Sequence, residues 1–270
     1  MNQSERRRFL IEELLNEVPA YADAAIPADA NGQRRLLRAL LNVRPPRAVP
    51  QRFLQVQDAY LREETARKGI VDGAALPPTA MEQGAALCIW QGDITTLKVD
   101  AIVNAANSGM TGCYVPNHTC IDNCIHTFAG VQLRQECARQ MEMQGYEEPT
   151  GRARLTPAYD LPAKFVLHTV GPIVDGPLTE RHCELLASCY HSCLKLAAEH
   201  GLQQVAFCCI STGVFGFPND RAAEIAVQTV REFLQMPTSI RQVIFNVFKD
   251  LDKQLYQQQL CPHGTAESRT

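Results

Sequence analysis

The sequence predicts an α/β fold in which helices cover both faces of a mixed or largely parallel sheet, preceded by a separate helical segment. From about residue 85 onward, short apolar runs of strand length alternate with longer segments of helical spacing. Before residue 80, the apolar residues follow helical spacing. Of the 270 residues, 46% are apolar, which is enough for one sizeable core and a small second domain.

Residues 1–80 are expected to form a helical extension. The segments RRRFLIEELLNE and QRRLLRALLNV both space their apolar residues along one face of a helix. A third helix is expected over residues 50–68, with Gly69 as its cap. The stretch DGAALPPTA is typical of a linker, so we place a domain boundary at residue 80 and assign residues 81–270 to the α/β domain.

The α/β domain is expected to alternate strands and helices. The strands are expected at about residues 85–90, 100–105, 152–157, 164–170, 204–210 and 242–248. The helices are expected at about residues 119–144, 179–200 and 219–235, with a last short helix after the final strand. In sheets of this kind, ligands bind beyond the carboxyl ends of the strands. The loops 104–120 and 211–218 are therefore the first candidates for a site.

The charge balance and the apolar pattern argue against several classes of protein. A net charge of −3 and a pI near 6.2 disfavour nucleic acid or a membrane surface as the main partner. The chain has no apolar run of signal-peptide length near its start and no run of ~18 apolar residues, so we expect a soluble, cytoplasmic protein. Eleven cysteines fit a reducing compartment, and all but Cys113, Cys120 and Cys124 are expected to be small buried hydrophobes.

The loop STGVFGFPND has the composition of a phosphate-binding turn. Gly213 and Gly216 free the backbone to approach a ligand, and Ser211 and Thr212 offer hydroxyl groups. The helix that begins near Asn219 adds the positive end of its dipole. It is not a Walker loop, because no G-K-[ST] follows. By spacing alone, an ordinary strand-to-helix turn is the more common structure for such a loop.

The loop GCYVPNHTC places Cys113, His118 and Cys120 within eight positions of the chain. Thiolate and imidazole suit Zn²⁺, and a Cys₂His set with one open position is typical of catalytic zinc. Iron is disfavoured because haem and iron–sulfur signatures are missing. The alternative is a pair of buried cysteines and a surface histidine without a metal. Cys124 is a further candidate ligand, although a core position suits it better, and His126 is expected to pack or cap.

Two other classes of zinc enzyme are excluded by their motifs. A nucleoside deaminase combines H-x-E with P-C-x-x-C. His182 and Glu184 supply the first half, but P-C-x-x-C occurs nowhere in the chain. A zinc metalloprotease needs H-E-x-x-H, which is also absent from the sequence.

Three local motifs, GDIT at 92–95, VNAANS at 103–108 and STGVFGFP at 211–218, occur in a characteristic order and separation. Together they resemble the macrodomain family, a group of ADP-ribose-binding α/β modules. The resemblance covers roughly residues 85–260. It implies a macrodomain-like three-layer α/β/α sandwich with a mixed central sheet, and it makes the phosphate loop part of an ADP-ribose site.

The resemblance also implies roles for individual residues. Asp93 would bind the adenine amino group, with the backbone of Ile94 beside it, and Asn107 would approach the distal ribose. Phe248, at the end of the last strand, is the candidate to lie by the adenine. The loop after residue 210 would wrap the diphosphate, with Phe215 near the distal ribose. The residues expected around the diphosphate and the distal ribose are Cys120, Ile121, Asp122, Ser211, Thr212, Gly213, Val214, Phe215 and Gly216.

In one segment the chain departs from the metal-free hydrolytic macrodomains. In those proteins, a run of glycines and then an acidic residue follow VNAAN. Here GCYVPNHTC replaces the glycines, and the acid follows directly as Asp122. This arrangement resembles the zinc-containing branch of the family, which some microbes encode near sirtuin-type ADP-ribosyltransferases. The resemblance implies one Zn²⁺ per chain, bound by Cys113, His118 and Cys120.

The function implied is zinc-dependent hydrolysis of mono-ADP-ribose from protein side chains, with release of ADP-ribose. Family resemblance alone favours esters of Asp or Glu, and it suggests a lipoyl-carrier protein and a sirtuin-type transferase as partners. Asp122 is expected to act as general base or to orient water, and Asn107 to orient the ribose. Alternatively, Asp122 only stabilises the helix dipole.

Two other functions fit the same motifs. A non-catalytic reader would bind ADP-ribosylated protein with a structural metal, and a hydrolase of small derivatives such as O-acetyl-ADP-ribose would use the same contacts. The open three-ligand set beside Asp122 favours a hydrolase over a reader.

Overall fold

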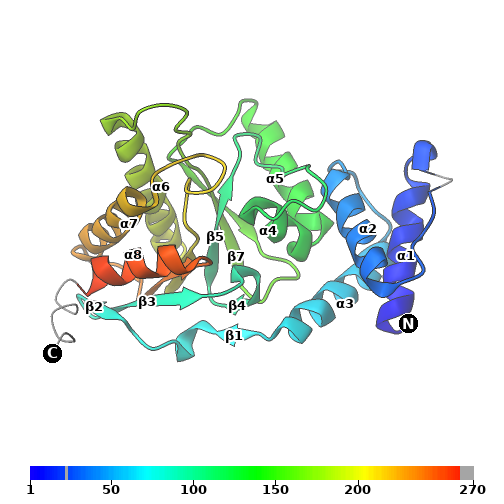
Figure 1. Ribbon diagram of the computed structural model, residues 1–270, viewed down its shortest axis with the longest axis horizontal. Helices are drawn as coiled ribbons and strands as arrows, with labels where there is room; N and C mark the ends of the chain where they lie inside the picture. Colours follow the sequence, from blue (N-terminus) through cyan, green and yellow to red (C-terminus); the bar gives the residue numbers. More distant parts are fainter. Residues whose placement is uncertain (22–23, 262–270) are drawn as a thin grey trace.

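A seven-stranded mixed sheet forms the centre of the protein, as seen in the computed structural model, which describes residues 1–21 and 24–261 (Figure 1). The strand order is β2-β3-β9-β8-β5-β7-β6. The five inner strands are parallel, and the edge strands β2 and β6 are antiparallel to their neighbours. The strands are β2 Ala80–Glu82, β3 Ala85–Gln91, β5 Ala101–Ala106, β6 Ala153–Pro157, β7 Phe165–Val170, β8 Gln204–Phe207 and β9 Gln242–Val247.

Helices cover both faces of the sheet, which confirms the predicted three-layer α/β/α sandwich. On one face, α4 (Ile121–Ala129) packs on β5 and α5 (Val131–Gln144) packs on β6. The other face carries α6 (Glu180–Glu199), α7 (Asn219–Leu234) and α8 (Asp250–Leu260) (Figure 1). Because both faces are covered, β9 is buried along its whole length, and all of its residues except Gln242 and Asn246 are apolar.

The N-terminal segment forms three helices with a hydrophobic cluster of their own. These are α1 (Gln3–Asn16), α2 (Ala30–Val43) and α3 (Gln51–Lys68), followed by Gly69 at a φ of 92°. Their cluster includes Val131 of α5, so the extension packs on the layer that contains α4 and α5. Short pieces follow: η1 is Pro19–Tyr21, β1 is Val71–Asp72, η2 is Gly73–Ala75, η3 is Ile94–Thr96 and β4 is Leu97–Lys98. The division at residue 80 stays a prediction.

The predicted single helix over residues 119–144 is wrong, because Gly130 interrupts it. This glycine has a φ of +88°, and it ends α4 and precedes α5. A Cβ on Gly130 would lie 2.6 Å from the side-chain nitrogen of Gln57 in α3. The Gln57 side chain also accepts the amide of Val131. At this point the amide of Val131 donates to Gln57 of the extension and not to a carbonyl of the preceding helical turn.

The predicted strand 204–210 ends early, at Phe207. It pairs with β5 only as far as Ala206 and with β9 only as far as Phe207. Cys208 and Cys209 therefore lie after the strand, contrary to the prediction, and the chain turns there toward the phosphate loop. Of the cysteines expected in the core, Cys209 is only half-buried and Cys261 is exposed. All eleven cysteines are free.

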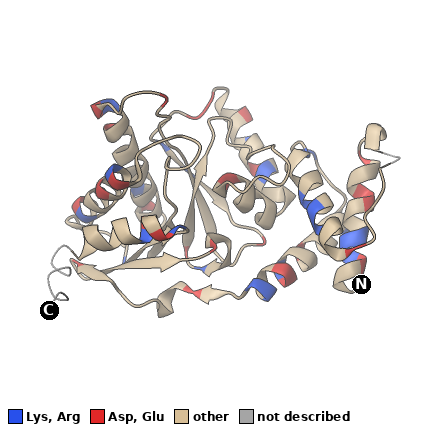
Figure 2. Cartoon of the chain, in the orientation of Figure 1, with Lys and Arg blue, Asp and Glu red and all other residues tan. Residues whose placement is uncertain are grey.

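Charged residues of both signs lie mainly on the outer helices and loops, and few lie on the central strands (Figure 2). Over residues 1–21 and 24–261, no helix is both long and apolar enough to cross a membrane.

Candidate functional site

The carboxyl ends of four neighbouring strands bring the predicted site segments together. In the order β3-β9-β8-β5, the strands are followed by Asp93, Phe248, the loop 211–216 and Asn107. Parallel strands end at the same edge of a sheet, so these segments form a continuous row along it. The sequence prediction that the two loops share one edge is thereby confirmed.

Asp93 lies at one end of this row and is held in a fixed orientation. One carboxylate oxygen accepts from the amide and the hydroxyl of Thr95, at 3.0 and 2.6 Å. The other oxygen is 2.9 Å from Nζ of Lys68, at the end of α3. Burial disfavours the charge of Asp93, but the bonds from Thr95 and the charge of Lys68 outweigh it and lower the pKa of the carboxyl group. Ile94 is buried beside it.

Lys68 was not predicted as a site residue. Its ammonium group also lies 3.1 Å from the centroid of the Phe128 ring, so it links the extension both to Asp93 and to α4. Lys68 and Asp93 are 25 positions apart in the chain. A contact at that separation depends on how α3 packs, and neither local motif carries a signal for it.

The loop 211–216 has the geometry of an anion-binding turn. Ser211 has a φ of 64°, and its buried hydroxyl has no hydrogen-bond partner among the residues that the structure describes. A side chain on Gly171 would meet that hydroxyl at 2.0 Å, so only glycine leaves room for it. Gly216 has a φ of 71°, and a Cβ added there would lie 2.8 Å from the carbonyl oxygen of Val174.

Several amides of this loop are free to bind a ligand. The loop closes on itself through the amides of Gly216 and Phe217, which donate to the carbonyls of Gly213 and Ser211. Within the described ranges, the amides of residues 212–215 donate to no protein acceptor. Unpaired amides on a glycine-bearing turn before α7 suit an anion such as a phosphate group.

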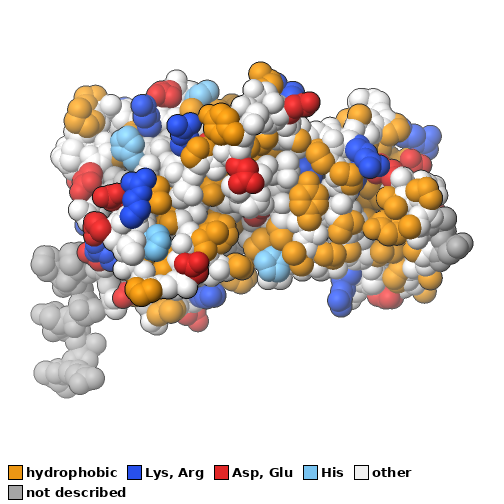
Figure 3. Space-filling view, turned by 90° about the horizontal axis from the view of Figure 1, so that it is seen from above, with side chains coloured by type: hydrophobic (Ala, Val, Ile, Leu, Met, Phe, Trp, Pro, Cys, Tyr) orange, Lys and Arg blue, Asp and Glu red, His pale blue; other side chains and the backbone are white. Residues whose placement is uncertain are grey.

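Exposed apolar side chains surround the row of segments. Val214 and Phe248 are 80% and 78% exposed, and Tyr114 and Val115 are exposed in the loop before Cys120. Seen from above, hydrophobic side chains are spread across the middle of the molecule (Figure 3). Phe248 directly follows β9, next to Gly92, whose amide donates to the carbonyl of Val247. It thus follows the strand beside the one that leads to Asp93, and its place beside the adenine stays a prediction.

Asp122 is buried in the first turn of α4 and held by two asparagines. Asn104 donates to one carboxylate oxygen at 2.8 Å, and Asn107 donates to the other at 3.2 Å. Burial raises the pKa of Asp122 to about 6, although these two bonds and the charge of Arg134 act to lower it. Asn104 therefore helps to hold the carboxylate of Asp122 in place.

A buried polar cluster lies behind Asp122. It contains His126, Cys137 and His168, whose candidate ligand atoms lie within 4.8 Å of one another. Both nitrogens of His168 already have partners, Asn104 at 3.1 Å and Thr156 at 3.0 Å, so we assign the cluster a structural role. Burial lowers the pKa of His168 to about 3 and that of His126 well below its usual value, so both rings are neutral.

Cys113, His118 and Cys120 converge in the loop before α4. Their ligand atoms all lie within 4.8 Å of one another, and Cys113 Sγ is 3.6 Å from His118 Nδ1. All three residues are half-buried. Two sulfurs and an imidazole nitrogen at this separation fit a tetrahedral Zn²⁺ with one position open. Cys124 is not in the group, because its Sγ contacts the side chain of Arg38 and the carbonyl of Thr119.

The loop is shaped to turn these ligands inward. Cys120 is the N-cap of α4, and its Sγ accepts the amide of Asn123 at 3.4 Å. Gly112 has a φ of 85°, and a Cβ there would lie 2.7 Å from the ring of His126. Burial, followed by the charges of Cys113 and Asp122, raises the pKa of Cys120 to about 12. A thiolate at this position needs a cation beside it at neutral pH.

Comparison with known proteins decides the family. The Macro domain family matches residues 103–226. Over 95% of its length, the chain is 58% identical to a protein-ADP-ribose hydrolase of Treponema medium, and it covers 98% of that protein. The chain belongs to the macrodomain family. A second relative, a protein-ADP-ribose hydrolase of Staphylococcus aureus strain MSSA476, is 49% identical over 94% of both chains.

Solved macrodomains share the fold. A Trypanosoma brucei macrodomain in complex with ADP-ribose is 30% identical, with a TM-score of 0.63, over 82% of this chain and 94% of that one. An Oceanobacillus iheyensis macrodomain with ADP is 37% identical, with a TM-score of 0.60, over 66% of this chain and 90% of that one. Both agree with the architecture described above.

Proposed function

We propose that this macrodomain is a hydrolase that removes mono-ADP-ribose from modified protein side chains and releases ADP-ribose. The relatives named protein-ADP-ribose hydrolases and the solved macrodomains with ADP or ADP-ribose support the assignment. The observation that carries it is the setting of Asp122. This buried carboxylate lies two positions after Cys120, one of three converging candidate metal ligands, and it is held by Asn107 at the end of β5. The strand next to β5 leads into the loop with unpaired amides.

The binding groove would hold the parts of the ligand that do not react. Asp93 would accept a hydrogen bond from the adenine amino group, with Ile94 and Phe248 beside the ring. The amides of residues 212–215, with the Ser211 hydroxyl, would bind the diphosphate. Contacts remote from the reacting carbon can orient it for attack, so the groove contributes to rate as well as to affinity.

Cys113, His118 and Cys120 would hold one Zn²⁺, which supplies Lewis-acid polarisation of an oxygen at the distal ribose or a bound water of lowered pKa. Asn107 reaches Asp122 and lies beside the expected ribose position, so it would orient both. Asp122 would accept a proton from the attacking water or hold that water in line. Its pKa of about 6 leaves most of the carboxyl group ionised at neutral pH, as a general base requires.

The substrate details rest on family resemblance. We propose an ester of Asp or Glu as the linkage, a lipoyl-carrier protein among the substrates, and a sirtuin-type ADP-ribosyltransferase as the enzyme that attaches the group. We also propose a cytoplasmic location. Tyr114, Val115 and Val214 are exposed in the two loops of the site, so they would be accessible to a modified protein.

The proposal is tested by incubating the zinc-loaded protein with a mono-ADP-ribosylated protein and measuring free ADP-ribose. We expect release by the wild type and none above background by Asp122→Ala, with ADP-ribose binding kept by both. Tight binding of the modified protein without release would instead indicate a reader. Turnover of O-acetyl-ADP-ribose alone would indicate a hydrolase of small derivatives.

A further inference from the structure

The metal loop, residues 113–120, is contacted from outside by helix α2 of the N-terminal extension. Arg38 donates from Nη2 to the carbonyl oxygen of His118 at 2.8 Å, across 80 positions of the chain. Asn42 accepts the amide of Asn117 at 2.9 Å, across 75 positions. Residues of the extension therefore bind the backbone of the loop at two consecutive positions, one of them a candidate metal ligand.

The contact from Asn42 is buried, and it binds the loop at a residue with a left-handed backbone conformation. Asn42 is 1% exposed, and its amide nitrogen donates to the hydroxyl of Thr127 in α4 at 2.9 Å. Asn117 has a φ of 56°, in the left-handed region that Asn adopts more readily than most residues with a side chain. The Asn42 side chain thus connects α2, α4 and the turn that precedes His118.

Arg38 also acts on the loop through Asn123. Its Nη2 lies 3.0 Å from Asn123 Oδ1, and the Asn123 amide nitrogen donates to the carbonyls of Cys113 and Val115 at 3.3 and 3.0 Å. Asn123 is fully buried. Arg38 therefore holds the segment from Cys113 to His118 at both ends. It binds the His118 carbonyl directly and the Cys113 carbonyl through Asn123.

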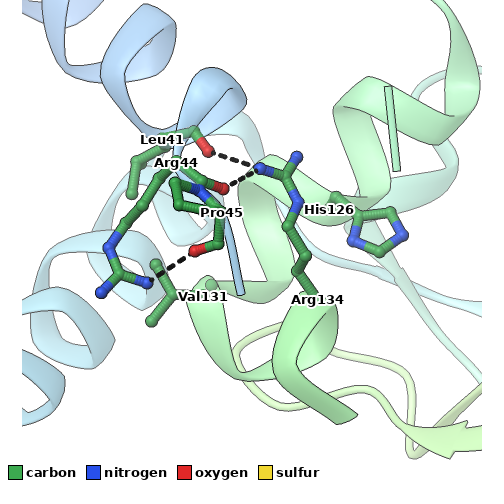
Figure 4. Close-up of a pocket in the computed structure, with 7 residues that line it drawn as sticks. Leu41, Arg44, Pro45, His126, Val131 and Arg134 are labelled. Atoms are coloured by element: carbon green, nitrogen blue, oxygen red, sulfur yellow. Dashed lines mark hydrogen bonds between the residues drawn. The ribbon is translucent and has the colours of Figure 1, made fainter. Parts of the chain in front are cut away.

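Arg134 of α5 fastens the end of α2 to the same loop. Its Nη1 donates to the carbonyls of Leu41 and Arg44 at 3.2 and 2.6 Å, and these bonds are drawn in Figure 4. A cation is favoured there because the last carbonyls of a helix have no partner within the helix. The same guanidinium lies 4.3 Å from the centroid of the Tyr114 ring in the metal loop. The position of α2 and that of the loop are therefore coupled.

This bracing matters because the loop has no regular secondary structure to place its ligands. Ordering such a segment costs conformational entropy, and that cost reduces metal affinity unless the free protein has already ordered it. Residues that orient metal ligands without touching the metal are a known determinant of affinity.

We propose that Arg38 and Asn42 are positioning residues through which the helical extension pre-forms the metal loop and sets its affinity for Zn²⁺. The inference rests on the metal site of the proposed function, and it assigns a role to the extension that the proposed function leaves open.

The test compares the Arg38→Met, Asn42→Ala double variant with the wild type in the full chain. Zinc-loaded protein is mixed with excess chromophoric chelator, and the rate of zinc transfer is recorded. We expect transfer from the double variant to be roughly 10- to 100-fold faster. In the metal-free proteins, amide hydrogen exchange over residues 113–120 is measured, and it is expected to be faster in the double variant. Arg38→Met alone is measured if the double variant does not fold.

Two variants control for simple destabilisation. Arg35→Met changes an exposed arginine of the same helix and should match the wild type in both measurements. Val230→Ala opens a cavity in the buried face of α7, on the other face of the sheet, so it should lower stability and keep zinc transfer within about twofold. Transfer and exchange in the double variant that equal those of Val230→Ala would overturn the proposal. If the wild type binds no zinc, the metal assignment fails, and the hydrogen exchange alone decides whether α2 orders the loop.

Discussion

Asn104 and Asp122 are joined by a buried hydrogen bond of 2.8 Å between the middle of the sheet and the first turn of α4. The same amide nitrogen lies 3.1 Å from Nδ1 of His168 on the adjacent strand β7. Asn107 binds the second carboxylate oxygen from the end of β5. The orientation of Asp122 is therefore set by the sheet as much as by the helix that carries it.

Replacing Asn104 is expected to impair turnover more than binding. In Asn104→Ala, the carboxylate of Asp122 loses one of its two amide donors, and a misplaced catalytic group can cost about 100-fold in rate. The affinity for ADP-ribose, measured by calorimetry, should stay within about threefold, because the loop 211–216 is untouched. Thr156→Val is the matched control, since it removes a bond to His168 without touching Asp122. Equal turnover in the two variants would contradict the assigned support role.

Replacing Asp122 itself should separate catalysis from metal binding. Asp122→Asn keeps the size of the side chain but removes the base, so we expect kcat to fall at least about 100-fold. Zinc content, measured by atomic emission, should remain near that of the wild type, because Asp122 is not among the three converging ligands. If the variant keeps full turnover, Asp122 serves only the helix dipole.

Removing one metal ligand should abolish stoichiometric zinc. His118→Ala leaves two thiols, and two ligands do not hold Zn²⁺ against a chelator. We expect the purified variant to contain little zinc and to release no ADP-ribose from modified protein. Cys261→Ser, at an exposed position outside the loop, is the control and should keep its metal. Full activity of metal-free wild-type protein would exclude a catalytic metal.

Most of the fold and the row of site segments at the ends of the strands could be predicted, because both depend on local sequence. β3 and β9 are mostly apolar runs; Phe248 directly follows β9, and Asp93 comes two positions after the end of β3. What was missed depends on tertiary packing. The interruption at Gly130 comes from the approach of Gln57, since the helical periodicity continues through it.

The contacts of Lys68 with Asp93 and of Arg38 with His118 likewise cross from the extension into the α/β domain. Helical spacing shows which face of α2 or α3 is buried, but it does not show what lies opposite. His168 was overlooked for another reason. It lies within an apolar strand, where a buried, neutral histidine leaves no trace in the pattern.

The conformation of the phosphate loop gives a prediction about affinity. Gly216→Ala places a Cβ 2.8 Å from the carbonyl oxygen of Val174 at a φ of 71°. The loop must move, so ADP-ribose binding should weaken by about tenfold or more, as measured by calorimetry. Gly201→Ala has a similar φ of 66° but meets nothing within 4 Å, so it should cost comparable stability without changing affinity. Equal affinities in both variants would argue against backbone binding by this loop.

Asp160 makes stability depend on pH near neutrality. Burial, followed by the charge of Asp58, raises the pKa of Asp160 to about 7, although Arg62 acts to lower it. The folded protein therefore keeps a proton that the unfolded chain has lost at its ordinary pKa of 3.8. Since the folded state binds more protons between these two values, the free energy of unfolding should fall as the pH rises from about 4 to about 7.

Asp160→Asn should remove this dependence, because an amide has no charge to bury beside Asp58. Between pH 5 and pH 8, the free energy of unfolding of the wild type should fall by roughly 2–4 kcal/mol more than that of Asp160→Asn. Urea denaturation of the metal-free proteins at the two pH values measures this difference. Metal-free protein is used so that zinc release does not enter the comparison. Asp220→Asn, on the exposed first turn of α7, is the control and should leave the pH profile unchanged. A profile in Asp160→Asn with the wild-type slope would show that Asp160 is ionised in the folded protein throughout this range.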